Sequence, residues 1–181
     1  MRFAKALLSV LFAGPAAPAD DTGDASGPRV YGYLETAEIG TSRLRLPAKL
    51  DTGATSTSVD ADEVSIYEKS PGDTWVRFSV TGEDGRTINY DQNVVAYVEI
   101  KEKGGGTQRR PVIELPVCVG DQLVLTEVNL ADRDNFDYPL LIGRGFLSSR
   151  VYVDAGGTFT AKPDCSDSPL QVAEEVDEEA E

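Results

Sequence analysis

The sequence predicts an all-β fold, a barrel or sandwich of short strands with one short helix. Segments rich in β-branched and aromatic residues recur along the chain, and turns containing glycine or proline separate them. Helical periodicity is almost absent, which argues against the main competing fold classes. Many short strands at regular spacing are typical of β-barrels and β-sandwiches. A length of 181 residues suits one such domain with tails.

Each expected element follows from its local pattern. Segment 42–50 alternates leucine with polar residues, and segment 75–80 alternates large with polar residues, as half-buried strands do. A glycine-bounded turn at 82–85 predicts a hairpin. The expected strands are 30–39, 42–50, 75–80, 87–92, 94–100, 111–119 and 122–130, followed by a helix at 144–149 and a hairpin over 151–161 around Ala155-Gly156-Gly157.

The two ends of the chain are expected to lie outside the domain. Arg2 and Lys5 are followed by an apolar run at 6–13 and then by Ala17-Pro18-Ala19, which is the layout of a secretory signal peptide. The alternative is an uncleaved anchor or a buried strand. Export would place the mature protein in the periplasm or outside the cell. The expected division is a signal peptide at 1–19, a linker at 20–28, the domain at 29–164 and an acidic disordered tail at 165–181.

Export favours a disulfide between Cys118 and Cys165, because secretory compartments are oxidising. The chain-entropy relation gives about 4 kcal/mol for closing a loop of this length. The alternative is two unrelated cysteines, one buried and one near a frayed end. A disulfide would tie the C-terminal segment to the body of the domain.

Charge and composition exclude several functions. The formal net charge is −14, so nucleic acids and anionic membranes would repel the chain. The apolar run at 6–13 is too short to span a bilayer, and we expect no membrane insertion. The sequence has no histidine, which excludes a Ser-His-Asp triad, a Cys-His pair and a histidine-ligated zinc. We therefore expect no metal and no cofactor, and any chemistry must use carboxylates, hydroxyls or lysines.

Two short motifs carry the candidate chemistry. The first, Asp51-Thr52-Gly53-Ala54, follows the strand expected at 42–50, and alone it also fits an ordinary turn. The second, Leu140-Leu141-Ile142-Gly143-Arg144, has the pattern of an apolar strand that ends in glycine and leads into the short helix. Neither motif is specific by itself.

In this order, and on an all-β chain, the two motifs resemble the retropepsin family of aspartic proteases. The similarity extends to a bacterial branch whose members carry the label "ATP-dependent zinc protease". That branch commonly has histidine where this chain has Asp60, and no nucleotide-binding loop follows the glycines at 104–106, so we expect neither zinc nor ATP. The similarity runs from about residue 31 to 161 and rests on blocks at 49–61, 75–78, 109–112 and 130–146.

The resemblance implies a closed β-barrel and a homodimeric peptidase in which Asp51 from each subunit forms a catalytic dyad. Thr52 would interlock the two active-site loops through its hydroxyl, and Gly53 would let backbone approach the substrate. Ala54 would fit the crowded space beneath the loop. The implied substrate is a peptide or protein bound as an extended strand.

The second motif is implied to support this loop. Leu141, Ile142 and Gly143 would lie beneath it, and Arg144 would form ion pairs near the dimer interface. A flap should cover the substrate and exclude water. The candidate flap turns are 82–85 and, second, 104–106.

Other interpretations stay open at this point. The fold can serve as a catalytically silent module that binds an extended peptide or an envelope component, because a fold alone does not decide function. A monomer could instead bind a metal through carboxylates such as Asp60 and Asp62, although a solvated acidic surface explains them as well. Asp132, Arg133 and Asp134 are expected to form a charged turn, with a contact from Arg133 or Asp134 to the active-site loop as the alternative.

Overall fold

The structure is a computed structural model that describes residues 27–101 and 105–173. Within these ranges it has twelve strands and one four-residue helix. In chain order the elements are β1 (Arg29–Ile39), β2 (Leu44–Leu50), β3 (Thr57–Asp60), β4 (Asp62–Ser70), β5 (Asp73–Thr81), β6 (Thr87–Asn93), β7 (Ala96–Lys101), β8 (Thr107–Val119), β9 (Gln122–Ala131), β10 (Leu140–Ile142), α1 (Arg144–Leu147), β11 (Val151–Thr158) and β12 (Gln171–Val172).

The all-β class and the short helix after Gly143 are confirmed. Strand β2 has the alternation of buried and exposed residues that its sequence predicted. Leu44, Leu46, Ala48 and Leu50 are buried, whereas the residues between them are exposed or half-buried. Successive side chains of a strand point to opposite faces, so these four enter the core. Burying a leucine side chain fully contributes about 1.5–3 kcal/mol.

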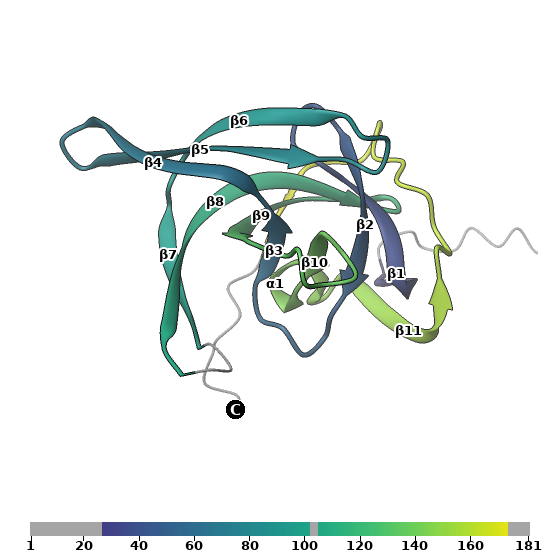
Figure 1. Cartoon of the computed structure of the whole chain (residues 1–181). Coiled ribbons are helices and arrows are strands. Elements are labelled where there is room, and N and C mark those ends of the chain that lie inside the picture. Colours follow the sequence, from purple (N-terminus) through teal and green to yellow (C-terminus); the bar gives the residue numbers. More distant parts are fainter. Residues whose placement is uncertain (1–26, 102–104, 174–181) are drawn as a thin grey trace, which may run out of the picture.

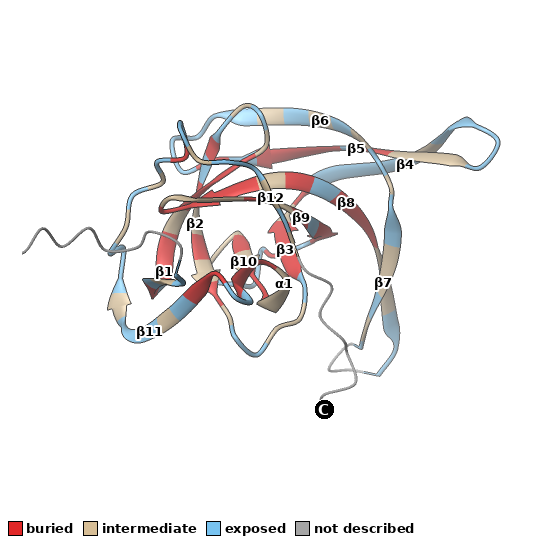
Figure 2. Cartoon of the chain, turned by 180° about the vertical axis from the view of Figure 1, so that it is seen from behind, coloured by how far each residue is buried: buried red, intermediate tan, exposed pale blue. Residues whose placement is uncertain are grey.

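Six strands of the larger sheet form a ring of pairings. Strand β1 pairs with β2 along one edge and with β8 along the other. The order therefore runs β1-β2-β10-β3-β9-β8 and returns to β1, with β11, β7 and β12 attached outside the ring. Figure 1 shows these strands curving around a common centre. Buried residues, red in Figure 2, are frequent on these strands. The largest fully buried side chains include Ile39, Leu46, Ile113 and Leu140 on the ring and Phe146 in α1.

A second sheet, β4-β5-β6, lies across one side of the ring. Its β4–β5 hairpin extends away from the body in Figure 1. The sequence did not predict β4, because eight of its nine residues are exposed and the strand shows no alternation of buried and exposed positions. Strand β5, in contrast, buries Val76, Phe78 and Val80, which matches the alternation predicted for that segment.

The predicted hairpin over 151–161 is wrong. Strand β11 continues through Gly157 and runs parallel to β1, with a shift of register between Gly32 and Leu34. A Cβ atom on Gly32 would lie 2.5 Å from the carbonyl oxygen of Gly157. The glycines therefore permit a close approach of two strands rather than a turn.

The buried carboxylate of Glu35 anchors the chain that follows β11. It accepts hydrogen bonds from the backbone N–H groups of Gly32 (2.8 Å), Thr160 (3.0 Å) and Ala161 (3.1 Å). Leaving a buried N–H unpaired costs about 1–3 kcal/mol. The chain after β11 therefore folds back onto β1 at this point.

The boundary predicted for the acidic tail is too early. Cys165 forms a disulfide with Cys118, with their Cα atoms 6.2 Å apart. The guanidinium group of Arg150 donates to the carbonyl of Val172 (2.7 Å), and β12 pairs with β9. The sequence prediction was based on the negative charge of residues 174–181, and composition gives no sign of these contacts. Residues 174–181, the predicted signal peptide at 1–19 and linker residues 20–26 lie outside the described residues.

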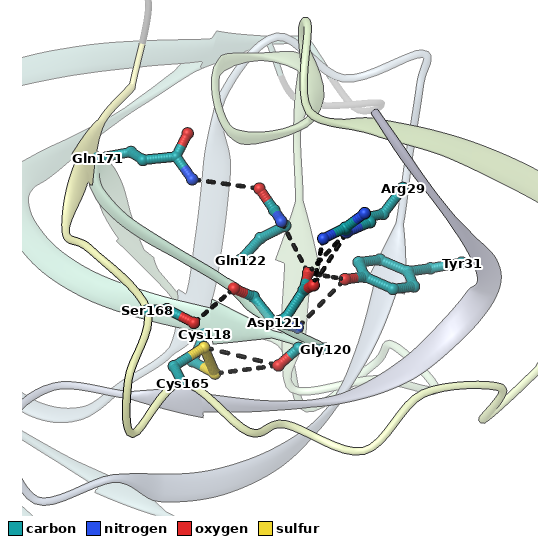
Figure 3. A network of polar contacts seen from close by, with 9 residues as sticks. All are labelled: Arg29, Tyr31, Cys118, Gly120, Asp121, Gln122, Cys165, Ser168 and Gln171. Carbon is teal, nitrogen blue, oxygen red and sulfur yellow. Dashed lines mark hydrogen bonds and ion pairs between the residues drawn. A yellow bond between two sulfur atoms is a disulfide. The ribbon is translucent and has the colours of Figure 1, made fainter. Parts of the chain in front are cut away.

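A polar network around Asp121 joins the start of β1 to the C-terminal segment (Figure 3). The Asp121 carboxylate accepts hydrogen bonds from Arg29 Nε (2.9 Å), the Tyr31 hydroxyl (2.7 Å) and Gln122 Nε2 (2.7 Å). The Ser168 hydroxyl donates to the Asp121 carbonyl (2.7 Å). Burial raises the pKa of Asp121, but the hydrogen bonds from Gln122, Arg29 and Tyr31 outweigh it and lower the pKa to about 2.

Replacing Asp121 with asparagine should therefore destabilise the fold in a pH-dependent way. The folded-state pKa of Asp121 is about 2, below the ordinary value of about 4. The carboxylate thus contributes stability that is fully present above about pH 4 and is lost as the pH falls through about 2. The difference in Tm between wild type and Asp121→Asn should be widest at neutral pH and should narrow in acid. Thermal unfolding followed by circular dichroism measures it, with the exposed Asp62→Asn as control; a constant difference would contradict the prediction.

Candidate active site

Asp51 lies where β2 leaves the sheet. Its backbone N–H donates to the carbonyl of Ile142 in β10 (2.9 Å), and the N–H of Ala54 donates to the Asp51 carbonyl (3.2 Å). The two carboxylate oxygens have different partners. The N–H of Gly53 donates to Oδ1 (3.0 Å), and the Lys49 ammonium group contacts Oδ2 (3.1 Å). These contacts fix the direction of the carboxylate within the turn.

The strand β10 and helix α1 pass directly beneath the loop because residue 143 is glycine. A Cβ atom on Gly143 would lie 2.5 Å from the carbonyl oxygen of Ser56. The φ angle of Gly143 is −93°, so glycine is needed for space and not for a left-handed backbone. Immediately afterwards the N–H of Arg144 donates to the carbonyl of Ala54 (2.8 Å). The second motif is therefore hydrogen-bonded to the first at Asp51 and at Ala54.

The side chain of Arg144 returns to the same loop. Its guanidinium group donates to the carbonyls of Thr52 (3.3 Å) and Gly53 (3.2 Å) and to the hydroxyl of Thr55 (2.9 Å). Within one subunit, Arg144 therefore braces the active-site loop.

Asn129 and Arg133 support the chain that follows the loop. The Asn129 amide donates to the Thr57 carbonyl (2.8 Å) and to the Ser56 hydroxyl (3.2 Å). Arg133 is buried and donates to the Ser58 hydroxyl (2.8 Å). The expected charged turn is present, with Asp132 and Asp134 exposed and the N–H of Phe136 donating to the Arg133 carbonyl (2.8 Å). The Arg133 side chain in addition contacts β3, the strand that leaves the active-site loop.

The carboxyl group of Asp51 is biased toward its ionised form. Burial raises the pKa of Asp51, but the hydrogen bond and charge of Lys49, with the Gly53 and Ala54 N–H groups, outweigh it and lower the pKa below its usual range. The Asp51 side chain is 27% exposed and that of Lys49 is 44% exposed. Burial also lowers the pKa of Arg133, while the charges of Asp60 and Asp51 oppose that shift. Lys49 in direct contact, and Arg133 at longer range, thus place positive charge near Asp51 in a chain that is acidic as a whole.

The acidic cluster beyond the loop is not the pair Asp60 and Asp62 that the sequence suggested. Asp60, Asp132 and Asp134 each place an oxygen within 4.8 Å of the others, and the last two are exposed. Burial is the main cause that raises the pKa of Asp60, and the nearby carboxylates of Asp62, Asp134 and Asp132 add to it. Asp60 also accepts the Arg133 backbone N–H (2.7 Å), which accounts for its position without an ion.

The structure contradicts the first flap candidate. The turn at 82–85 packs beside the beginning of β2, where the N–H of Glu83 donates to the Arg45 carbonyl (3.0 Å). Asp51 follows the other end of this strand, about 20 Å away at the usual rise per residue. The second candidate, 104–106, lies partly outside the described residues.

Sequence reasoning missed two residues of this site. Lys49 stands two positions before Asp51, and period-two alternation puts both on the same side of the chain. That signal was available in the sequence. Asn129 contacts the loop from β9 across 72 residues of sequence, and no local pattern marks it.

The all-β ring, with an exposed Asp-Thr-Gly turn laid over a strand, a glycine and a short helix, defines a retropepsin-like aspartic protease fold. Residues 30–164 match the family model described as RimB-like, retropepsin-like aspartic endopeptidase RimB. The chain therefore belongs to the RimB-like family of retropepsin-like proteins.

The chain is also similar to a solved structure and to part of two curated proteins. A protein from Legionella pneumophila with unknown function has a crystal structure that is 36% identical and superposes with a TM-score of 0.62, covering 74% of this chain and 98% of that chain. A protein of Shewanella pealeana named "Probable alpha-L-glutamate ligase" is 28% identical over 117 residues, which is 63% of this chain and 25% of that protein. A protein of the same name from Desulfotalea psychrophila is 29% identical over 112 residues, 60% of this chain and 24% of its own length. The chain thus spans about a quarter of the length of these curated relatives.

A search of the described residues for a helix long and apolar enough to cross a membrane found none.

Proposed function

We propose that this chain is an exported, homodimeric aspartic endopeptidase whose dyad consists of Asp51 from each of two subunits. The observation that carries the proposal is the Asp51-Thr52-Gly53 loop, which is braced by β10 and α1 and leaves the Asp51 carboxylate partly open to solvent. It is the one Asp-Thr-Gly segment within the described residues; the other in the sequence, at 21–23, lies outside them. One carboxyl group cannot be base and acid in the same step. A second copy of the chain must therefore supply the second carboxyl group. Two carboxyl groups a few Å apart share one proton, because ionising both is unfavourable.

The proposed reaction is hydrolysis of a peptide bond by an activated water. The ionised Asp51 takes a proton from water while the water oxygen attacks the carbonyl carbon. The protonated Asp51 of the partner subunit gives its proton to the carbonyl oxygen, which forms a neutral tetrahedral diol. The diol then collapses. The C–N bond breaks, the amine nitrogen receives the proton that Asp51 took from water, and one diol hydroxyl returns its proton to Asp51 of the partner subunit as it becomes the carbonyl of the new carboxyl group.

The surroundings of the loop support dimerisation. Thr52 and Gly53 are exposed, so their outer faces are open to a second molecule. Their carbonyls are held from within by Arg144, which keeps the loop in one conformation before a partner arrives. Any ion pairing of Arg144 across the interface would add to this bracing.

The relatives suggest which peptides to try first. They are named as ligases of glutamate, and the segment they share with this chain is a fraction of their length. Lys49 and the other cations around Asp51 favour negatively charged peptides. Glutamate-containing peptides are therefore the first substrate class to test.

Export to the periplasm or beyond is part of the proposal. The basic start, apolar run and small residues of the N-terminus support it. The disulfide between Cys118 and Cys165 supports it independently, because such bonds persist in oxidising compartments.

The proposal is tested by digesting a mixed peptide library, enriched in glutamate, between about pH 4 and pH 7. We expect internal cleavage that is strongest toward the acid side. Sedimentation of the mature chain in the same buffers should show a dimer at the concentrations that support cleavage. A monomer at every concentration, or no cleavage under any condition, favours the alternative of a catalytically silent module that binds an extended peptide.

A further inference from the structure

Lys49, in β2, contacts Asp51, which directly follows the last residue of that strand. Its ammonium nitrogen lies 3.1 Å from Oδ2 of Asp51, while Oδ1 is occupied by the Gly53 N–H. The two positions are separated by one residue, and Lys49 is paired with Leu34 on one side and Leu141 on the other. Both neighbouring strands thus fix the backbone from which the ammonium group reaches the carboxylate.

The other charges that face Asp51 come from two further elements. Arg133, in the segment between β9 and β10, acts on Asp51 through its charge. Arg144, in α1, binds the carbonyls of Thr52 and Gly53 beside it. Both guanidinium groups already bond to neutral oxygens, whereas Lys49 is the cation in direct contact with the carboxylate. All three charges favour the ionised form.

We propose that Lys49 is a positioning residue that holds Asp51 as a carboxylate and so sets the pH range in which the dyad works. The inference rests on the proposed function, and it adds a residue that the Asp-Thr-Gly motif does not contain. In a symmetric dimer each Asp51 would carry its own Lys49. Two nearby carboxylates repel each other and retain one proton, whereas the two ammonium groups oppose that retention.

Lys49 should therefore shift the pH range of activity toward lower pH. Catalysis requires the singly protonated dyad, and cations beside both carboxylates lower the pH at which that form is populated. Removing the cation should move both limbs of the pH profile of kcat to higher pH. The effect is moderate because Lys49 and Asp51 are 44% and 27% exposed and water screens the pair.

The test compares Lys49→Met with Lys49→Arg in the full chain. Each pH profile of kcat is first scaled to its own maximum. On the alkaline limb, the scaled kcat of Lys49→Met should then exceed that of wild type by roughly two- to fivefold. Lys49→Arg keeps the charge and should restore the wild-type profile. Lys69→Met is the matched control, because that ammonium group lies over the Trp75 ring on the β4–β5 hairpin. Coincident limbs in wild type and Lys49→Met would overturn the inference.

A second measurement does not depend on activity. Carbon-13 NMR of the Asp51 carboxyl group reports its titration directly, and in Lys49→Met this titration should move to higher pH. If the titration moves but no peptide is cleaved by any variant, the role of Lys49 stands and the proposed function fails. If peptides are cleaved but the titration and the pH profile stay in place, the role of Lys49 fails and the peptidase assignment stands.

Discussion

Replacing Asp51 with asparagine is expected to lower kcat/KM for peptide cleavage by about 1,000-fold or more. An amide cannot accept the proton of the attacking water, and it cannot exist in the ionised form that the dyad requires. The fold should survive, because the bonds that place the loop, from the Asp51 N–H to Ile142 and from Ala54 to the Asp51 carbonyl, are made by the backbone. Peptide cleavage followed by mass spectrometry measures the loss, and thermal unfolding checks the fold.

The matched control is Asp62→Asn, which neutralises an exposed carboxylate at the start of β4. It should cleave as wild type does. Equal cleavage by Asp51→Asn and wild type would remove Asp51 from the mechanism. Loss of activity in both variants would point to net charge and not to the dyad.

Mixing wild-type and Asp51→Asn subunits tests whether both copies act together. If subunits exchange at random, an equal mixture should retain roughly a quarter of the activity of the same total amount of wild type, because only dimers with two intact aspartates work. Independent subunits would retain roughly half. The mixture therefore separates a shared dyad from two separate sites.

The parts of this molecule that could be predicted from sequence are those determined locally. The Asp51 loop follows a strand whose alternation is visible from Leu44 to Leu50, and the strand before Gly143 is uniformly apolar. The place of the three residues of β10 and of Gly143 beneath the Asp51 loop came from the family resemblance and not from their local pattern. The motif and its support were therefore predicted with their residues, while dimer formation and activity stay predictions.

The parts that could not be predicted depend on tertiary contacts. β4 is exposed on almost every residue, so burial leaves no imprint on its sequence. β11 looked like a hairpin because Gly156 and Gly157 commonly make turns, yet the space they leave admits the neighbouring β1 at Gly32. The turn at 82–85 has the composition of a mobile tip, and only the folded structure shows that it binds the Arg45 carbonyl.

Gly143→Ala is expected to impair both stability and catalysis, although it adds a single methyl group. The new Cβ atom would lie 2.5 Å from the Ser56 carbonyl oxygen and 2.8 Å from that of Thr55. These are backbone atoms, so no side-chain rotation relieves the contact, and either the loop or β10 must move. Overpacking of this kind costs about 1–3 kcal/mol of unfolding free energy. A displacement of about 1 Å at catalytic groups costs about 100-fold in rate.

The control for Gly143→Ala is Gly27→Ala, where a Cβ atom would meet nothing within 4 Å. Urea unfolding measures the free-energy difference, and kcat/KM on the best peptide measures the catalytic loss at a temperature where both variants are folded. The two losses together locate the effect in the loop, because a purely global destabilisation would leave kcat/KM of the folded fraction unchanged. Wild-type values for both quantities in Gly143→Ala would mean that the strand-glycine-helix element does not hold Asp51 in place, and the support assigned to the second motif would fall with it.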